Sequence, residues 1–188
     1  LKYLKSKDIT LEQMTEAGLV IAGPDIAEPY DRFRNRVMFP IADARGRVIA
    51  FGGRALSADA KAKYLNSPET PLFHKGRVLY NLNRARKPAH DEGTVIAVEG
   101  YMDVVGLAQG GIMNAVAPLG TALTEDQIQL LWRMSPEPVL CFDGDKAGLR
   151  AAYRAVERVL PLLKPGHSLS FALLPDGKDP DARVREDV

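Results

Sequence analysis

Five carboxylates in the second half of the chain each lie at or just beyond the end of a short apolar run, where they could act together as metal ligands. They are Glu99, Asp143, Asp145, Asp179 and Asp181. Carboxylates gathered at one place repel one another, and a divalent cation removes that repulsion. Oxygen ligands without nearby Cys or His favour Mg²⁺ or Mn²⁺ over zinc. The chemistry predicted for such a site is metal-assisted phosphoryl transfer.

Alternating strands and helices are expected to position these carboxylates. The apolar runs that predict strands are TVIAVEG (94–100), IMNAVAPLG (112–120), EPVLCFDGD (137–145) and SLSFALLP (168–175). Segments of helical spacing separate them, which predicts right-handed crossovers and a parallel sheet. The carboxyl ends of parallel strands share one edge, so all the acidic groups should meet there. Asp143 and Asp145 are two residues apart and, on a strand, should point the same way.

The helices carry their own signals. Thr124 and Gln127 form a predicted capping box, and Thr10 and Gln13 form a second one near the start of the chain. The segment KAGLRAAYRAVERVLPLL (146–163) predicts a helix. Its expected buried stripe consists of Ala152, Val156, Val159 and Leu163.

Each acidic feature also has a plainer interpretation. The triplet DGD is often a simple turn, and DPD a loop opening. Glu99 by itself could cap a helix that starts near Tyr101. Asp103 stands in the first turn of that helix, where a carboxylate suits the helix dipole. It is therefore expected to interact with the dipole or to support the metal ligands, and not to bind the metal directly. The convergence of three acidic groups on one edge favours the metal site.

Composition limits the class of protein. The chain has 188 residues and 46% hydrophobic content, enough for one large domain or two small ones. No apolar run approaches the roughly 18 residues that a membrane span needs. Cys141 is the single cysteine, which excludes an internal disulfide framework and a cysteine-rich zinc site and indicates a reduced, cytoplasmic location.

Charge divides the chain into two halves. Residues 32–87 carry 13 Lys or Arg against 3 Asp or Glu, and residues 88–188 carry 9 against 15. A basic half indicates either a solvated face or a site for a polyanion. The basic half contains a predicted hairpin, RVMFPI and RVIAFGGR around ADARG, and a loop-rich segment, KYLNSPETPLFHKG. We therefore expect two domains, a basic part at 1–90 and a catalytic α/β part at 91–188.

The acidic motifs resemble a known fold. VEGYMDV, APLGTALT, CFDGDKAG and LLPDGKDPD, in this order, look like the toprim fold shared by topoisomerases and primases. RFRNRVMFPI, GRVIAFGGR, KYLNSPET and FHKGRVLYNL resemble the RNA-polymerase core of bacterial DnaG-type primases. The resemblance covers nearly the whole chain. It implies a toprim-type, four-stranded parallel sheet with flanking helices, preceded by a smaller basic α+β subdomain.

The resemblance also implies an activity. It is template-directed synthesis of short RNA primers on single-stranded DNA, in which a 3′-hydroxyl attacks the α-phosphate of a nucleoside triphosphate. By the family pattern, Glu99 and Asp143 would hold the catalytic Mg²⁺, for which Mn²⁺ can substitute. Asp143 and Asp145 would hold a second ion, with Asp179 and Asp181 nearby.

The basic residues match the family's groove for nucleic acid and nucleotide. The stronger matches are Arg54, Lys63, Asn66 and Lys75. Lys and Arg suit phosphate contact. The weaker candidates are Arg34 and Arg36, which would share one face of a strand, and Lys146, which directly follows the DGD triplet.

The implied partners are a single-stranded DNA template, an RNA primer and nucleoside triphosphates, and no membrane. Primases of this type also have a zinc-binding N-terminal domain and a C-terminal domain that docks to the replicative helicase. Neither is found in this sequence, so we expect a monomeric fragment of the core, which would act in the cytoplasm, at the replication fork of the nucleoid.

Other classes of protein share parts of the pattern. A phosphohydrolase would use the first aspartate of DGD as nucleophile and would not need the basic half. A topoisomerase would need a strand-cleaving tyrosine on another domain. A toprim module that only binds DNA, as in recombination mediators, would not need an intact acidic set.

Overall fold

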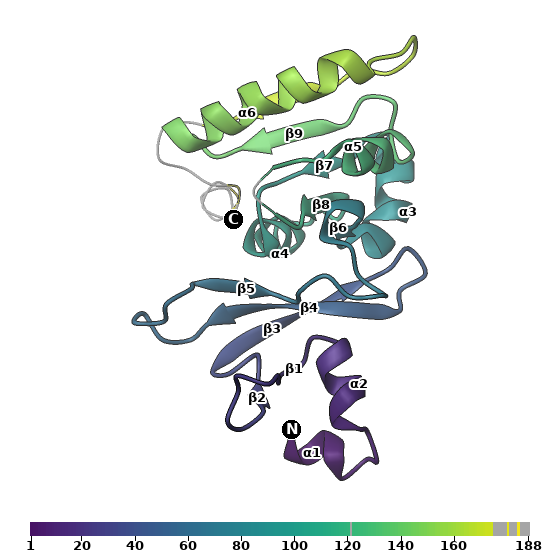
Figure 1. The fold of residues 1–188 in the computed structure, drawn as a ribbon. Helices are drawn as coiled ribbons and strands as arrows, with labels where there is room; N and C mark the ends of the chain where they lie inside the picture. The colour runs from purple at the N-terminus through teal and green to yellow at the C-terminus, as the bar shows by residue number, and fades with distance from the viewer. Residues whose placement is uncertain (121, 175–179, 181–183, 185–188) are drawn as a thin grey trace. The chain divides into compact units, whose positions relative to one another are not determined.

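The computed structural model of the chain describes all residues except 121, 175–179, 181–183 and 185–188 (Figure 1). It consists of two compact units. The first comprises residues 1–42 and 47–74, and the second comprises residues 43–46 and 75–188. The expected domains, a basic part at 1–90 and a catalytic part at 91–188, stay a prediction. Within the described residues, no helix has the length and apolar character needed to cross a membrane.

The first unit contains two short helices and small antiparallel sheets. Its elements are α1 (Lys2–Lys5), α2 (Leu11–Glu16), β1 (Val20–Ile21), β2 (Tyr30–Asp31), β3 (Arg36–Ala42), β4 (Val48–Ala55) and β5 (Tyr64–Asn66). Strands β3 and β4 pair antiparallel from Arg36 opposite Ala55 to Ala42 opposite Val48, which confirms the predicted hairpin. Strand β5 extends this sheet on the other side of β4.

The second unit alternates strands and helices. Its elements are η1 (Lys75–Arg77), β6 (Leu79–Tyr80), α3 (Leu82–Glu92), β7 (Ile96–Ala97), α4 (Tyr101–Gln109), β8 (Ala115–Pro118), α5 (Glu125–Trp132), β9 (Val139–Phe142), α6 (Lys146–Val159), η2 (Leu160–Leu162) and β10 (Ser170–Leu173). The strand order is β10-β9-β7-β8-β6. The four strands predicted from the apolar runs are parallel, as expected.

A fifth strand, β6, was not predicted. It pairs antiparallel with β8, with Leu79 opposite Pro118 and Tyr80 opposite Ala117. A strand of two residues has no measurable alternation of apolar and polar side chains, so its sequence carries no period-two signal.

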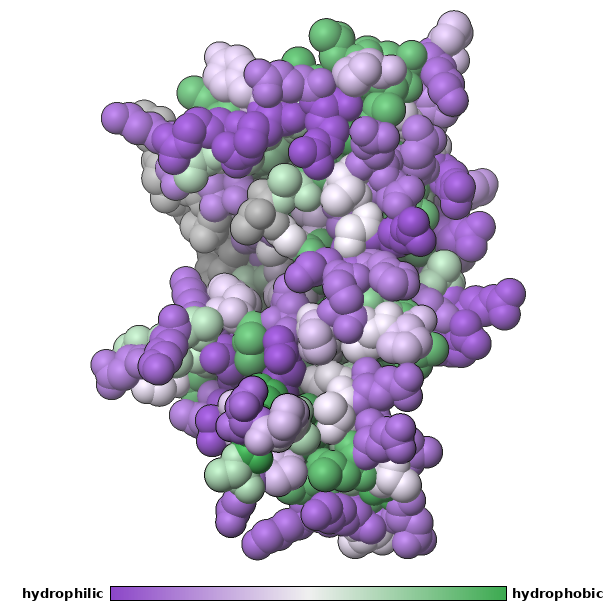
Figure 2. All heavy atoms as spheres, viewed as in Figure 1, coloured by the Kyte–Doolittle hydropathy of each residue, from purple (hydrophilic) through white to green (hydrophobic). Residues whose placement is uncertain are grey.

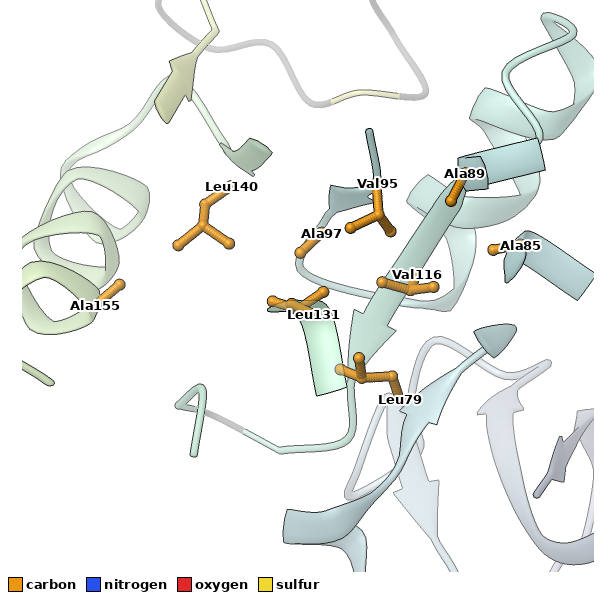
Figure 3. Packing of buried hydrophobic residues seen from close by; sticks show 9 residues of the cluster. All are labelled: Leu79, Ala85, Ala89, Val95, Ala97, Val116, Leu131, Leu140 and Ala155. Atoms are coloured by element: carbon orange, nitrogen blue, oxygen red, sulfur yellow. The ribbon is translucent and has the colours of Figure 1, made fainter. Parts of the chain in front are cut away.

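Helices cover both faces of this sheet. Alternate residues along β9 face opposite sides: Leu140 packs with α3, α5 and α6, whereas Cys141 packs with α4. Figure 3 shows the side chains of the first cluster, which come from four strands or strand ends and three helices and converge on one core. They are Leu79, Ala85, Ala89, Val95, Ala97, Val116, Leu131, Leu140 and Ala155. Leu131 and Trp132 are core residues, as expected.

Helix α6 buries a different stripe from the predicted one. Ala152 and Val159 are buried as expected, but Val156 is 41% exposed and Leu163 is 44% exposed. The buried stripe is Gly148, Ala152, Ala155 and Val159. Small residues let the helix lie close to the sheet, and the larger side chains point outward. Figure 2 shows hydrophobic atoms at the surface in the region of α6. The helix gives way to the 3₁₀ turn η2 at Leu160, one residue before Pro161, which lacks the amide hydrogen needed to continue it.

Candidate metal centre and nucleic-acid residues

Glu99 and Asp143 meet at the carboxyl edge of the parallel sheet. Strand β7 ends two residues before Glu99, and β9 ends directly before Asp143. The two strands are neighbours, with Ala97 opposite Leu140, so both loops leave the sheet at the same edge. There the Glu99 Oε1 atom accepts a hydrogen bond from the backbone N–H of Asp143, at 3.2 Å. This hydrogen bond joins two residues that are 44 positions apart in the sequence, at the edge of the sheet where they were expected to meet.

Asp145 has a structural task that the sequence did not predict. Strand β9 ends at Phe142, so Asp143 and Asp145 lie in the following loop, and the argument from strand alternation is wrong for them. The Asp145 Oδ1 atom accepts hydrogen bonds from the backbone N–H groups of Ala147 and Gly148, each at 2.7 Å. Asp145 therefore caps the N-terminus of α6. Its role as a metal ligand stays a prediction, and it would use the other carboxylate oxygen, Oδ2.

Three carboxylates act electrostatically on the Cys141 thiol, which lies on β9. Burial, and after it the negative charges of Asp103, Asp143 and Glu99, together raise the pKa of the Cys141 thiol to about 11. The Oδ1 atom of Asp143 is buried. An accumulation of negative charge around a partly dry pocket suits a divalent cation. Cys141 itself is buried, as expected for a small apolar residue.

Asp103 stabilises the local chain. Its Oδ2 atom accepts a hydrogen bond from the Gly100 N–H at 2.8 Å, at the start of α4. This agrees with the expected place in the first turn of the helix, where the carboxylate also faces the positive end of the helix dipole.

The donor set fits a hard cation, although the described residues supply only part of it. Among them, no group of three or more His, Cys, Asp or Glu side chains is arranged to hold a metal ion. Glu99 and Asp143 provide carboxylate oxygens, the type of ligand that Mg²⁺ and Mn²⁺ prefer. Asp179 and Asp181 lie outside the described residues.

Two hollows border this edge. Asp143, Asp145 and Lys146 line a surface depression together with Leu149 and Leu173. A separate cavity of about 340 Å³ lies beside Glu99. Its wall includes Phe142 from the sheet and Arg154 and Arg158 from α6, two arginines that the sequence motifs did not single out. The sequence showed only their i, i+4 spacing on a predicted helix. This spacing indicates that they share a helix face, but not that they line a cavity.

The stronger nucleic-acid candidates of the first unit lie on or beside strands β4 and β5. Arg54 is on β4 opposite Tyr64 of β5, and Asn66 closes β5. Lys63 precedes β5, with its Nζ atom 5.9 Å from the centroid of the Tyr64 ring. The Asn66 carbonyl accepts hydrogen bonds from the Arg32 guanidinium at 3.0 and 3.3 Å. Strands β4 and β5 thus bring these candidates together.

Arg34 and Arg36 do not share a strand face. Strand β3 begins at Arg36, and Asn35 before it has a φ of +53°, so the alternation argument is wrong for this pair. The Arg36 guanidinium donates to the carbonyls of Gly53 at 3.1 Å and Ala62 at 2.9 Å. It therefore stabilises backbone groups around the β4–β5 connection. Arg34 stacks over the Tyr30 ring, 4.7 Å from its centroid.

Lys75 and Lys146 are the basic candidates of the second unit. Lys146 is the first residue of α6, and Lys75 is the first residue of η1. Both side chains are exposed. The Lys75 carbonyl accepts a hydrogen bond from the side chain of Gln127, 52 residues away. The sequence identified Gln127 only as a member of a capping box, and no local pattern announces this second contact.

Comparison with known proteins agrees with this description. Residues 1–86 match the family model described as DNA primase catalytic core, N-terminal domain, and residues 93–172 match the Toprim domain model. The parallel sheet with acidic loops at its carboxyl edge is therefore a Toprim domain. The chain belongs to the family of DnaG-type primase catalytic cores.

The relatives are similar in both sequence and structure. The chain is 56% identical to the DNA primase of Pseudomonas aeruginosa over 185 residues, 98% of this chain and 28% of that protein. It is 53% identical to the DNA primase of Escherichia coli K12 over 94% of this chain and 30% of that protein. The chain thus spans less than a third of the length of these relatives.

Two solved structures extend the comparison. A crystal structure of a DNA primase domain from Pseudomonas aeruginosa has a TM-score of 0.89 and 56% identity, over 94% of this chain and 55% of that one. A structure of the DnaG primase catalytic domain bound to ssDNA has a TM-score of 0.88 and 51% identity, over 98% of this chain and 58% of that one.

Proposed function

We propose that this chain is part of a primase catalytic core, which synthesises short RNA primers on single-stranded DNA at the replication fork. The reaction would be nucleotidyl transfer, with attack of a 3′-hydroxyl on the α-phosphate of a nucleoside triphosphate and release of pyrophosphate. The observation that supports it best is the hydrogen bond between Glu99 and the Asp143 backbone at the carboxyl edge of a Toprim sheet.

The acidic edge would hold divalent metal. Glu99 and Asp143 would provide the first ligands for Mg²⁺, which Mn²⁺ can replace, with Asp145, Asp179 and Asp181 as further ligands. Bound there, the ion would neutralise charge on the reacting phosphate. The Glu99 hydrogen bond orients the Asp143 loop, and the capping bonds of Asp145 hold the start of α6. These contacts preorganise the carboxylates before a ligand arrives.

The basic residues would hold polyanions. Arg54, Lys63 and Asn66 on the β4–β5 region, and Lys75 in the second unit, are proposed to contact template or nucleotide phosphates. Lysine and arginine provide such contacts without reading sequence. We propose that this chain acts within a longer protein. That protein would also hold the RNA primer, carry the zinc-binding domain and dock to the replicative helicase.

Incorporation of labelled nucleotides into RNA on a single-stranded template tests the function. We expect Asp143→Asn to abolish incorporation and to weaken Mn²⁺ binding, because an amide oxygen carries no charge. Asp91→Asn is the matched control, since Asp91 is an exposed carboxylate that pairs with Lys87 on α3. Full incorporation by Asp143→Asn would refute the assignment.

A Toprim module that only binds DNA is the second candidate, since the basic half alone can attract nucleic acid. Such a module would bind single-stranded DNA equally well as wild type and as Asp143→Asn, and it would incorporate no nucleotide with any metal. Metal-dependent incorporation that is lost in Asp143→Asn excludes it.

A further inference from the structure

Gln127 is a buried glutamine whose hydrogen bonds leave its own helix. Its side chain is 1% exposed, beneath the first turn of α5. The Nε2 atom donates to the carbonyls of Lys75 at 2.9 Å and Val78 at 3.0 Å. Its Oε1 atom accepts from the Thr124 N–H at 3.0 Å. A buried amide that makes all of these hydrogen bonds holds its partners rigidly. Breaking any one of them would leave a buried polar group without a hydrogen-bond partner.

Two neighbours of Gln127 hold the same segment. The Thr124 hydroxyl donates to the Gly76 carbonyl at 2.5 Å and accepts from the Gln127 N–H at 3.2 Å. Arg77 forms an exposed ion pair with Asp126, 3.0 Å from Nε to Oδ2. The first turn of α5 therefore contacts four consecutive residues, 75–78, and these include the whole of η1.

The topology of the second unit puts this segment at the carboxylate edge. Strand β6 follows it and runs antiparallel to β8, with Leu79 opposite Pro118, the last residue of β8. Residues before Leu79 therefore extend beyond the carboxyl end of β8. Strand β8 is parallel to β7, whose carboxyl end leads to Glu99. Lys75 therefore lies beyond the same edge of the sheet as the loops that carry Glu99 and Asp143.

Capping alone does not require these contacts. The box formed by Thr10 and Gln13 on α2 has the same T-x-x-Q sequence and the same two bonds, at 2.9 and 3.2 Å. There the glutamine is exposed. The burial of Gln127 and its bonds to Lys75 and Val78 are therefore additional to capping.

We propose that Gln127, together with Thr124, is a positioning residue for Lys75. It fixes the main chain of residues 75–78 so that the Lys75 ammonium meets a phosphate group of nucleic acid or nucleotide at the carboxylate edge. This inference rests on the proposed function, in which Lys75 contacts phosphate. Gln127 itself touches no substrate.

Binding of a fluorescent single-stranded oligodeoxythymidylate to the whole chain, measured over a range of salt concentrations, tests the inference. Lys75→Met should weaken binding roughly tenfold or more, as for a lost bond to a charged group. It should also reduce the slope of log K against log salt by about 0.7, the value for one phosphate contact on a single strand. Gln127→Met should reproduce the loss of slope, and Gln13→Met should not.

Three further variants separate positioning from mere stability. The double variant Lys75→Met with Gln127→Met should bind no more weakly than Lys75→Met alone, because both changes remove one contact. Thr124→Ser keeps the hydroxyl and should bind as wild type, whereas Thr124→Val should share the loss. If Gln127→Met fails to fold, this threonine pair carries the test.

The outcomes distinguish this inference from the proposed function. A folded Gln127→Met protein with the wild-type slope, or an additive double variant, overturns the positioning role and leaves that of Lys75 intact. Wild-type binding by Lys75→Met overturns the phosphate contact and the positioning role with it. Primer synthesis is a separate readout, so its failure does not enter this result.

Discussion

Replacing Asp145 separates helix capping from metal binding. The Asp145 Oδ1 atom accepts two backbone N–H groups at 2.7 Å, at the start of the 14-residue helix α6. Loss of a side-chain cap lowers the free energy of unfolding by about 0.5–2 kcal/mol. Loss of the negative charge at the helix N-terminus removes roughly a further 0.3–1 kcal/mol. We expect Asp145→Ala to lose both contributions.

Asp145→Asn isolates the charge, because the amide oxygen still accepts the two hydrogen bonds. It should lose only about 0.3–1 kcal/mol. At about 2–4 °C per kcal/mol for a chain of this size, Asp145→Ala should lower Tm by roughly 2–12 °C and Asp145→Asn by roughly 1–4 °C. If Asp145 also binds metal, Asp145→Asn should weaken Mn²⁺ binding far more than it lowers Tm.

Thermal unfolding followed by far-UV circular dichroism, in a metal chelator, measures the cap. Titration of Mn²⁺ at a temperature where all variants are folded measures the ligand role. Asp91→Ala is the control, since solvent screens an exposed i, i+4 pair and its loss should leave Tm nearly unchanged. A Tm of Asp145→Ala equal to that of wild type would refute the capping argument, and equal Mn²⁺ affinity of Asp145→Asn and wild type would refute the ligand role.

Three further predictions follow from packing and burial. Gly148→Ala places a Cβ atom 2.2 Å from the Asp143 carbonyl oxygen, so it should lower the free energy of unfolding by roughly 1–3 kcal/mol and weaken Mn²⁺ binding. Gly120→Ala is the control, because its Cβ atom meets open space and should change neither stability nor Mn²⁺ binding. Scanning fluorimetry measures the first quantity, and Mn²⁺ titration measures the second. Leu131→Ala, at a fully buried position, should lower the free energy of urea unfolding by about 2–5 kcal/mol, and a loss below about 1 kcal/mol would contradict the packing. Burial raises the pKa of Tyr80 above its ordinary value of 10, so the folded state keeps its phenolic proton when the unfolded state loses it, and stability should fall as pH rises above 10. Urea midpoints on both sides of pH 10 check this, and Tyr80→Phe should reduce the fall.

Local patterns predicted a large part of the fold. The four parallel strands and the β3–β4 hairpin were visible as apolar runs between turn residues. Both capping boxes were visible too, because their hydrogen bonds join residues only three apart. Strand β6 was not predicted, because a strand of two residues is too short to show an alternation of apolar and polar side chains.

The meeting of Glu99 and Asp143 was also predictable, although they are 44 residues apart. Parallel strands that alternate with helices must end at a common edge, so topology alone brings their carboxyl-end loops together. The role of Asp145 was not predictable in the same way. It depended on strand β9 ending one residue before Asp143, and the ends of elements are set by tertiary packing and capping.

The sequence by itself determined the four parallel strands, the helices between them and the edge at which Glu99 and Asp143 meet, because these depend on spacing along the chain. Only the tertiary structure decided that Arg36 donates to backbone carbonyls, that Val156 faces outward and that Gln127 reaches Lys75. Each of these depends on which surface packs against a given side chain. A pattern with a period of two or four residues shows that a residue lies on a face, and the fold determines what that face meets.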